Sequence, residues 1–432
     1  MNSAVNPFVH NRVPTPTEFL GREPELRRLF SRLANGQATA IIGQPKVGKT
    51  SLLKYVREAR PWQESFGTYF DQDLFSFQDV PALRNIESPA EFWRRVLEPL
   101  TVCLQAGQPE PLQSLVDIYS LAQKNMFGTF ELEQLFNKLH HVGSRLVLWL
   151  DHFDSILSHP ILNNAGFYAE LRSLASRSNG FVLVIITRQD LTHLHEKTKA
   201  INYGSPYFDV FTEIRLSSLS KTTMLKLLNR AENRFDQSDH DYVMTVSGGH
   251  PYLAQIAAAK LWDGHEEGLK GTARYITAGS ELYHEVESHF AETWRFWTDE
   301  FRIAVTTVAL IQIPRLLAQS SLVEIGLLDD LANYAPELAM LETAGVVTYE
   351  DSEGWRITQA AFLWWLIDEL RRTIRGESNF KTWLEKRERG GRLTRQEHET
   401  VESAAKKVLA ALDRGAMTLI EIFAKKFGEG VK

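Results

Sequence analysis

The sequence predicts an α/β protein in which a parallel sheet sandwiched by helices is followed by an α-helical lid domain, a winged-helix domain and a small helical C-terminal module. Two observations predict this arrangement. Apolar runs of strand length, such as LVLWL and FVLVIIT, alternate with helical patterns over the first half of the chain, which favours parallel strands joined by helices. Beyond residue 217 successive helical patterns occur, and the segment VVTYEDSEGWRIT then predicts a β-hairpin turning at Asp351–Gly354.

The domain boundaries follow from these changes of pattern. A chain of 432 residues exceeds what one hydrophobic core normally organises, so several domains are expected. We expect an extended lead-in over residues 1–18, the sheet domain over 19–217, the helical lid over 218–297, the winged helix over 298–372 and the C-terminal module over 373–432.

Turn and cap residues locate the elements of the sheet domain. The helix GREPELRRLFSRLA is expected to end at Asn35-Gly36, because glycine readily adopts the left-handed conformation that ends helices. The stretch FGTYFDQDL predicts the second strand. Ser88 and Pro89 open a single predicted helix through SPAEFWRRVLEPLTVCLQAG, and Thr129 is expected to cap the helix that follows.

The composition is that of an ordinary globular protein, with 44% hydrophobic and 24% charged residues. A formal net charge of −6 argues against extensive coating by nucleic acid. The single cysteine, Cys103, excludes an internal disulfide and a cysteine-based zinc cluster, which fits a reducing compartment. The sequence has no apolar signal core at its start and no run of about 18 apolar residues. We therefore expect a cytoplasmic protein that does not enter a membrane.

The segment GQPKVGKT matches the pattern G-x-x-x-x-G-K-[ST] and lies between a predicted strand and a predicted helix. Glycines let backbone N–H groups curl around phosphate oxygens, Lys49 reaches the β- and γ-phosphates, and Thr50 offers a hydroxyl to Mg²⁺. Lys46 is expected to point to solvent rather than to phosphate. The motif predicts a P-loop domain that binds ATP or ADP with Mg²⁺, through Gly43, Gln44, Pro45, Lys46, Val47, Gly48, Lys49, Thr50 and Ser51.

A carboxylate at the end of a buried strand should complete the metal site, and LVLWLDHFD supplies Asp151. The alternative is that Asp151 only caps the end of the strand. The next position is usually a glutamate that orients the attacking water in active ATPases, whereas here it is His152. His152 is interpreted either as a weak base or as a bystander, and Asp154 is a second candidate for polarising water. The sequence therefore predicts slow hydrolysis.

The strand FVLVIIT is followed by Arg188, which is a candidate sensor of the γ-phosphate. A guanidinium suits phosphate because its planar fork can donate to two oxygens at once. The alternative is a surface arginine that pairs with Asp190 or Glu196.

Several segments, taken in order, resemble the STAND class of signal-transduction ATPases, which are relatives of AAA+ proteins that include the NOD-like families. These segments are FLGREPEL, GQPKVGKTSLL, LVLWLDHFD, VLVIITR and SGGHPYLAQ, and the resemblance spans roughly residues 19–370. It implies that Gly21 and Arg22 lie against the adenine side, and that His250 and Pro251 belong to a lid motif whose proline packs on the base. His250 is also consistent with a helix-start residue packed beside Pro251.

The resemblance implies a switch in which ADP holds the domains closed and ATP opens them for homo-oligomerisation. It also implies a separate effector or sensor protein, for which the C-terminal module with Lys406-Lys407 and Lys425-Lys426 is the expected contact surface. Those charges are more typical of a solvated helix face than of a contact surface. A capping box at Thr394 is expected to start a helix of this module.

Two other function classes compete with the signalling switch. A DNA-loading AAA+ ATPase of the origin-recognition or transposition-regulator type also joins a P-loop domain to a winged helix. DNA is disfavoured as a partner because the expected recognition helix, DDLANYAPELAMLETAGV, contains no Lys or Arg for phosphate contacts. A small-molecule kinase is disfavoured by the long helical extension and by the lack of a visible acceptor site.

Overall fold

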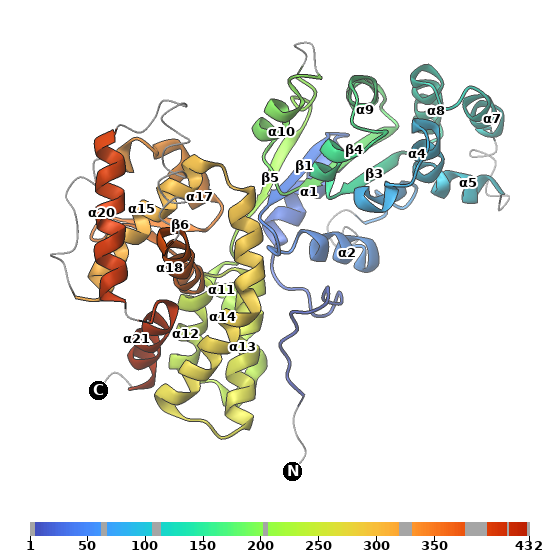
Figure 1. Ribbon diagram of the computed structural model, residues 1–432. Coiled ribbons are helices and arrows are strands. Elements are labelled where there is room, and N and C mark those ends of the chain that lie inside the picture. The colour runs from blue at the N-terminus through green and yellow to red at the C-terminus, as the bar shows by residue number, and fades with distance from the viewer. Residues whose placement is uncertain are drawn as a thin grey trace. The chain divides into compact units, whose positions relative to one another are not determined.

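The computed structural model describes residues 5–61, 67–105, 114–201, 206–318, 331–375, 395–412 and 414–429. The chain forms two compact units, which are described separately here (Figure 1). The sheet unit comprises Thr15–Gln44 and Gly48–Leu216. The helical unit comprises Met1–Pro14, Pro45–Val47 and Ser217–Lys432.

A five-stranded parallel sheet is the centre of the sheet unit, with the strand order β2-β3-β4-β1-β5. Strands β3 and β4 are buried along their whole length, as expected for continuously apolar strands covered on both faces. Because β4 lies between β1 and β3, the carboxyl ends of these three strands meet at one edge of the sheet. The strands span Thr39–Gly43 (β1), Leu74–Asp79 (β2), Leu146–Asp151 (β3), Phe181–Thr187 (β4) and Thr212–Leu216 (β5).

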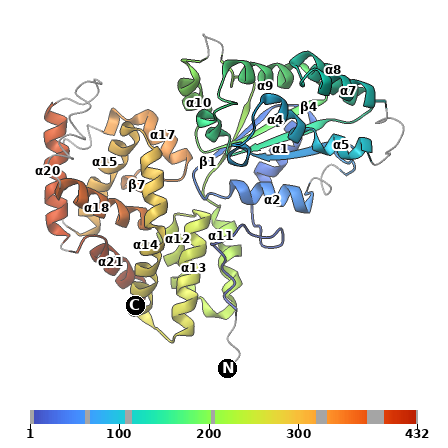
Figure 2. The same cartoon turned by 45° about the vertical axis from the view of Figure 1, so that its right-hand side comes forward.

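Helices cover both faces of this sheet, which confirms the predicted sandwich (Figure 2). They are α1 (Glu23–Ala34), α2 (Lys49–Ala59), α4 (Pro89–Val96), α5 (Glu98–Gln105), α7 (Val116–Lys124), α8 (Thr129–His141), α9 (Ala165–Arg177) and α10 (Leu191–Thr198), with 3₁₀ turns η1 (Val80–Leu83) and η2 (Phe153–Ser158).

Side chains of a strand alternate between the two faces, and β3 shows this directly. Leu148 and Leu150 join the core cluster formed with α4, α8 and α9. Trp149 faces the other way and stacks on Phe77 with 5.7 Å between ring centroids, while Arg57 of α2 lies 5.7 Å over the Phe77 ring. The two faces of the sheet therefore have separate cores.

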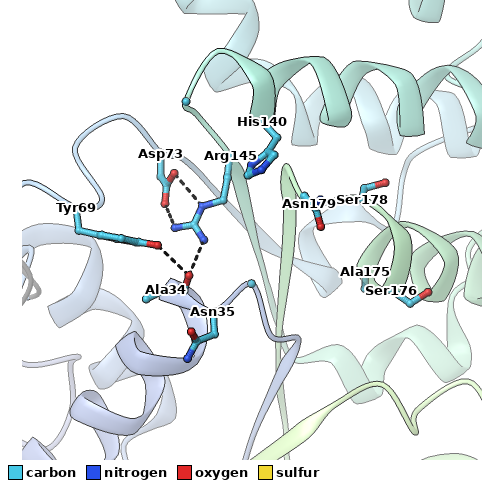
Figure 3. A pocket seen from close by; sticks show the side chains of 12 residues that line it. Ala34, Asn35, Tyr69, Asp73, His140, Arg145, Ala175, Ser176, Ser178 and Asn179 are labelled. Atoms are coloured by element: carbon cyan, nitrogen blue, oxygen red, sulfur yellow. Dashed lines mark hydrogen bonds and ion pairs between the residues drawn. The ribbon is translucent and has the colours of Figure 1, made fainter.

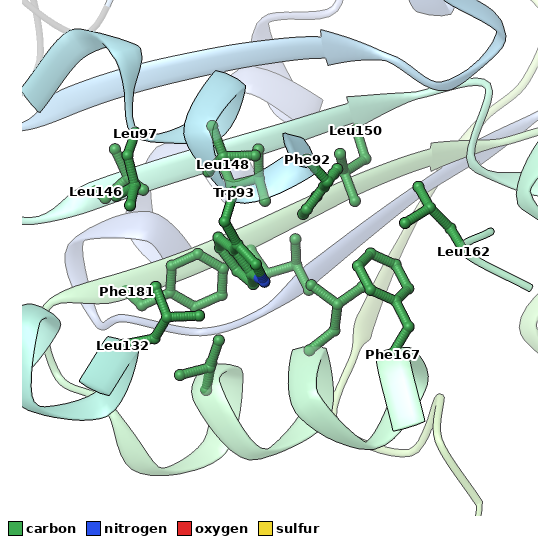
Figure 4. Packing of buried hydrophobic residues seen from close by; sticks show 14 of the residues in the cluster. Phe92, Trp93, Leu97, Leu132, Leu146, Leu148, Leu150, Leu162, Phe167 and Phe181 are labelled. Atoms are coloured by element: carbon green, nitrogen blue, oxygen red, sulfur yellow. The ribbon is translucent and has the colours of Figure 1, made fainter. Parts of the chain in front are cut away.

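Trp93 of α4 lies in the middle of the core cluster (Figure 4). Its ring packs against Phe136 and Phe181, with centroids 6.2 and 5.9 Å away. Its indole N–H donates to Glu170 Oε1 at 2.6 Å, and Thr129 Oγ1 donates to the other carboxylate oxygen at 2.8 Å. Burial raises the pKa of Glu170, and these two hydrogen bonds partly offset that rise. The buried indole is thus satisfied by a side chain of α9.

A salt bridge ties the amino edge of the sheet together (Figure 3). Arg145, just before β3, contacts Asp73, just before β2, through Nε–Oδ1 at 3.2 Å and Nη2–Oδ2 at 2.6 Å. The same guanidinium donates to the carbonyl oxygens of Leu33 and Ala34 at 2.8 and 3.3 Å, at the end of α1. Tyr69 donates to Ala34 as well, at 3.0 Å. A cavity of about 580 Å³ at the edge opposite the P-loop is bordered by Ala34, Tyr69, Asp73 and Arg145.

Two of the predicted caps are confirmed and one is wrong. Gly36 follows α1 with φ 67°, and Ser88 Oγ accepts from the backbone N–H of Glu91 at 3.3 Å at the start of α4. Helix α8 is preceded by Gly128, so Thr129 is its first residue rather than its cap. The Thr129 hydroxyl is engaged with α9 instead.

The second strand begins later than FGTYFDQDL predicts, because residues 67–72 form turns. The Asp71 N–H donates to the Thr68 carbonyl at 3.0 Å, and Phe70 is buried against Phe30 with 5.9 Å between ring centroids. Phe70 therefore fills a core rather than extending a sheet, and β2 runs from Leu74 to Asp79.

The predicted single helix from Ser88 is also divided, between α4 and α5. Pro99 has no N–H to donate to the carbonyl four residues earlier and disfavours helical geometry at the residue before it. The carbonyl of Arg95 accepts from Gln78 Nε2 at 3.3 Å instead. The break therefore leaves a backbone acceptor that β2 satisfies.

In the described residues, the helical unit contains helices and one short β-hairpin, and its longest helix is Gly271–Phe296 (Figure 1). Among the described residues no helix combines the length and the apolarity that crossing a bilayer requires. The elements are α11 (Lys221–Leu228), η3 (Asn229–Arg234), α12 (Gln237–Ser247), α13 (Pro251–Glu266), α14 (Gly271–Phe296), α15 (Asp299–Leu316), α17 (Ala335–Thr343), β6 (Val347–Glu350), β7 (Gly354–Ile357), α18 (Ala360–Arg375), α20 (Arg395–Ala411) and α21 (Ala416–Gly428).

The extended N-terminal segment packs along α13. Asn6 Nδ2 donates to the Ala259 carbonyl at 3.2 Å. Phe8 is 4% exposed and stacks on Phe235 with 5.5 Å between centroids, and its ring meets the edge of Trp262 at 6.4 Å. This segment is therefore part of the helical unit's core.

Strands β6 and β7 pair antiparallel with Val347 opposite Ile357, which confirms the predicted hairpin. Gln312 of α15 holds the hairpin, because its Oε1 accepts from the Ile357 N–H at 2.8 Å. Asp368 of α18 accepts from the Ala416 N–H at 3.0 Å and so caps the start of α21. The winged-helix interpretation of these elements stays a prediction, and Thr394 lies outside the described residues.

Candidate functional site

The phosphate-binding motif lies at the carboxyl end of β1 and runs into α2, as predicted. Gly48 has φ 102°, a conformation that favours glycine strongly because it has no Cβ. No side chain caps α2, so the N–H groups of its first turn remain available to an anion. Thr50 and Lys46 are exposed, and Ser51 continues the helix. The sequence thus folds into a backbone cradle suited to phosphate.

Lys49 is the buried cation of this cradle. Its side chain lies at the start of α2 and is only 8% exposed. The ammonium donates to the carbonyl oxygens of Gly43 and Gln44, both at 2.7 Å. Burial lowers the pKa of Lys49 to about 8, while the nearby Asp154 and Asp151 charges raise it and Arg188 lowers it. The lysine is therefore held at the loop with little water around it.

Asp151 and Thr50 are brought together, as the metal-site prediction requires. Asp151 ends β3 and is 5% exposed. Its Oδ2 accepts from Thr50 Oγ1 at 3.3 Å, and its Oδ1 accepts from the His152 N–H at 2.8 Å. One hydroxyl and one carboxylate fit Mg²⁺, which usually takes one or two protein ligands and completes its shell with phosphate and water.

His152 is held by a carboxylate that the sequence did not single out. It adopts a left-handed backbone conformation with φ 51°, and its Nδ1 lies 2.9 Å from Asp79 Oδ1. A carboxylate can only accept, so Nδ1 carries the hydrogen and Nε2 is the acceptor of the neutral ring. The His152 side chain is 41% exposed, so Nε2 has access to solvent.

Asp79 is the last residue of β2 and stands opposite Asp151 in the register of the parallel pair β2–β3. Its position follows from the pairing of strands that are far apart in the sequence. The sequence signal for Asp79 is a carboxylate at a strand end, but the predicted strand FGTYFDQDL ends at Leu74, before Asp79. Asp79 was therefore missed.

Asp154 and Arg188 form an ion pair beside the loop. Asp154 lies in η2 and its side chain is 2% exposed. Its Oδ2 accepts from Arg188 Nε at 2.8 Å, and its Oδ1 accepts from the Arg188 backbone N–H at 3.3 Å. Arg188 thus pairs with Asp154 rather than with Asp190 or Glu196. Asp190 caps α10 by accepting from the His193 N–H at 2.7 Å.

The residues assigned by resemblance lie in both units. Gly21 and Arg22 have φ 74° and 72°, and the Arg22 guanidinium is 3.4 Å from Glu25 Oε1 at the start of α1. Burial lowers the pKa of Arg22. His250 and Pro251 start α13 in the helical unit, where His250 is 2% exposed and its ring centroid lies 5.7 Å from that of His289.

The strand order, the loop after β1 and the carboxylate at the end of β3 define a P-loop nucleoside-triphosphatase fold. The chain belongs to the AAA-like domain family, whose pattern matches residues 19–297. It is therefore a nucleotide-binding AAA-like ATPase. A comparison with curated proteins found no match.

Three solved structures are similar to this chain at low sequence identity. A Walker-type ATPase of Pyrococcus abyssi is 15% identical, with a TM-score of 0.51 over 83% of this chain and 99% of that protein. The ORC2 protein of Aeropyrum pernix, solved in ADPNP–ADP complexes, is 15% identical and covers 94% of this chain and 98% of its own, with a TM-score of 0.46. A STAND protein with a tetratricopeptide repeat sensor from Pyrococcus horikoshii is 13% identical, covers 99% of this chain and 59% of its own, and has a TM-score of 0.34.

Proposed function

We propose that this protein is a STAND-type molecular switch that binds ATP and ADP with Mg²⁺ and hydrolyses ATP slowly. Its nucleotide state controls a separate effector through a conformational change or homo-oligomerisation. The observation that carries the proposal is the occupant of the water-activating position: His152, held by Asp79, stands where fast ATPases have a glutamate. A site that binds the phosphates of ATP but hydrolyses ATP slowly is suited to a molecular switch.

Binding rests on the loop and on the metal pair. Lys49 exchanges its two backbone acceptors for β- and γ-phosphate oxygens when nucleotide enters. Mg²⁺, held by Thr50 and Asp151, would neutralise phosphate charge and orient the γ-phosphate. Tight retention of nucleotide follows from a buried cation and a dedicated metal pair.

Hydrolysis rests on weaker groups. In the tautomer fixed by Asp79, His152 Nε2 accepts a proton from water, although a neutral imidazole is a poorer electrostatic partner than a carboxylate. Asp154 is engaged by Arg188 on both oxygens, so it positions Arg188 beside Lys49 rather than acting as a base. Arg188 is 24% exposed and remains our candidate sensor of the γ-phosphate.

The signalling role is tested by sizing the purified protein by light scattering with ADP and with a non-hydrolysable ATP analogue. We expect a defined change of mass or of hydrodynamic radius with the analogue and none with ADP. Lys49→Ala removes the cation of the loop, so this variant should lose nucleotide binding and show no change. An identical response of wild type and Lys49→Ala would contradict the P-loop assignment, and no response in either would contradict the switch.

The alternative is a DNA-loading AAA+ ATPase, and the same experiment includes an arm with duplex DNA. Helix α17, the expected recognition helix, reads APELAMLET and offers no cation to a phosphate backbone. We therefore expect DNA to add nothing to the response. Assembly that requires DNA as well as the analogue would favour the DNA-loading function over the signalling switch.

A further inference from the structure

A cavity of about 350 Å³ lies within the helical unit, between the hairpin, α12, α15 and α21. Residues of the hairpin that line it include Trp355 and Arg356, and α15 contributes Arg315. Helix α21 contributes Lys426. Sites for small molecules commonly enclose about 300–1,000 Å³ and combine apolar walls with a few polar groups. The nucleotide function described above uses none of these residues.

The cationic groups of this cavity outnumber its carboxylates. Arg315 donates to the backbone carbonyl of Glu353, and neither Arg315 nor Lys426 forms an ion pair with another described residue. Arg356 pairs with Glu350, but its Nε is buried and has no hydrogen-bond partner in the described part of the chain. A buried donor without an acceptor is costly, so this Nε–H is suited to donate to a bound group, although the Arg356 side chain as a whole is 43% exposed. An anion in the cavity would supply an acceptor.

The walls of the cavity suit a planar group. Trp355 and Phe423 line it, and the Trp355 ring meets that of Tyr349 with 5.3 Å between centroids. Aromatic faces and guanidinium planes stack on flat heterocycles, and guanidinium forks bind phosphate. The lining of this cavity thus combines aromatic with cationic residues.

We propose that this cavity binds a small organic anion that carries a planar ring, of the nucleoside monophosphate class, as an effector separate from the nucleotide at the P-loop. The hairpin, α15 and α21 all contribute to it, so such a ligand would link the C-terminal helix to the hairpin. This role also gives a function to Lys426 of the Lys425-Lys426 pair. The proposal goes beyond the ATP-dependent switch and does not depend on ATP hydrolysis.

The test uses the full chain carrying Lys49→Ala, which silences the P-loop site, and calorimetric titration with AMP. Titration with adenosine measures the contribution of the ring alone, and titration with inorganic phosphate measures that of the anion alone. A short single-stranded DNA tests whether the cavity prefers a nucleic-acid polymer to a small molecule. We expect saturable binding of AMP that is tighter than binding of either part. Lys426→Gln should weaken it about tenfold or more, because a charge-assisted hydrogen bond is lost. Lys425→Gln is the matched control, since Lys425 does not line the cavity, and it should bind AMP normally.

A second readout is the fluorescence of Trp355. AMP should quench tryptophan emission in the Lys49→Ala protein and leave the emission of a Lys49→Ala, Trp355→Leu protein unchanged. Absence of AMP binding, or equal binding by the Lys426→Gln protein, overturns the proposal. If inorganic phosphate binds as tightly as AMP, the proposal that the ligand carries a planar ring is wrong. If the DNA strand binds more tightly than AMP, the proposal that the ligand is a small molecule is wrong. All of these outcomes leave the P-loop function untouched.

Discussion

A single buried amine sets the pH range in which this protein should hold nucleotide. Burial lowers the pKa of Lys49 to about 8, so the ammonium is charged below that pH and neutral above it. Phosphate binds the charged form, so affinity should be constant below about pH 8. Above that pH it should weaken by up to about tenfold per pH unit, because one proton is taken up with the nucleotide. Titration of a fluorescent ATP analogue between about pH 7 and about pH 9 measures this dependence.

The matched control for this titration is Lys49→Arg, which stays charged over the whole range. It should flatten the profile even where it lowers the affinity. A wild-type affinity that is independent of pH would show that Lys49 does not titrate as its surroundings require.

The residue that follows Asp151 gives a second prediction at this scale. If His152 accepts the proton of the attacking water, His152→Ala should lower kcat for ATP hydrolysis on the order of 10²-fold and leave the Kd for ATP unchanged. Asp79→Asn should lower kcat by a smaller factor, because the amide still accepts from Nδ1 but lacks the charge that stabilises an imidazolium. Phosphate release under saturating ATP measures both.

Asp71→Asn is the control for the carboxylate, since Asp71 is exposed and lies before β2, at the opposite end of that strand. It should hydrolyse ATP like wild type. A normal kcat for His152→Ala would make His152 a bystander, which is the other interpretation that the sequence left open.

Residue-level prediction can propose site residues where chemistry fixes the spacing along the chain. The glycines, Lys49 and Thr50 are recognisable because one loop must present them together, and Asp151 because it ends an apolar run. Asp79 was not recognisable, since its contact with His152 depends on the register of β2 against β3. The partner of Arg188 was missed for a similar reason, because Asp154 comes from a different strand–loop connection.

At the scale of elements, the salt bridge at the amino edge of the sheet should be important for stability. Asp73 and Arg145 have side chains only 4% and 11% exposed. Removing one partner of a buried pair leaves the other charge uncompensated, so Asp73→Ala should destabilise the sheet unit by about 3–5 kcal/mol. Chemical denaturation measures this change. Tyr69→Phe, which removes one hydrogen bond from a 56% exposed ring, should cost about 1 kcal/mol or less. Equal effects of the two changes would contradict a special role for the ion pair.

The elements themselves were predictable wherever apolar periodicity was continuous. Strands β3 and β4 are continuous apolar runs and lie where expected. The errors have local causes that periodicity does not register. Pro99 divides a pattern that otherwise reads as one helix, and residues 67–72 form turns in which Phe70 packs against Phe30.

At the scale of the whole molecule, the helical unit is built mainly from two parts of the chain that lie on either side of the sheet unit in the sequence. The sequence predicted a succession of domains from one end to the other. The extended segment near the start instead belongs with α13, and the chain then builds the sheet before it returns to the helical unit at Ser217. Hydrophobic periodicity cannot predict where the N-terminal segment packs, because an extended segment without periodicity does not indicate which helix it contacts.

That return has a consequence for synthesis on the ribosome. Asn6 and its acceptor Ala259 are separated by 253 positions. At about 5–20 residues per second, the nascent segment that contains Phe8 must wait on the order of tens of seconds before α13 emerges. Throughout that interval the Phe8 side chain has no native partner to cover it. We therefore expect this short segment to be a site at which a chaperone binds the nascent chain, or at which nascent chains aggregate.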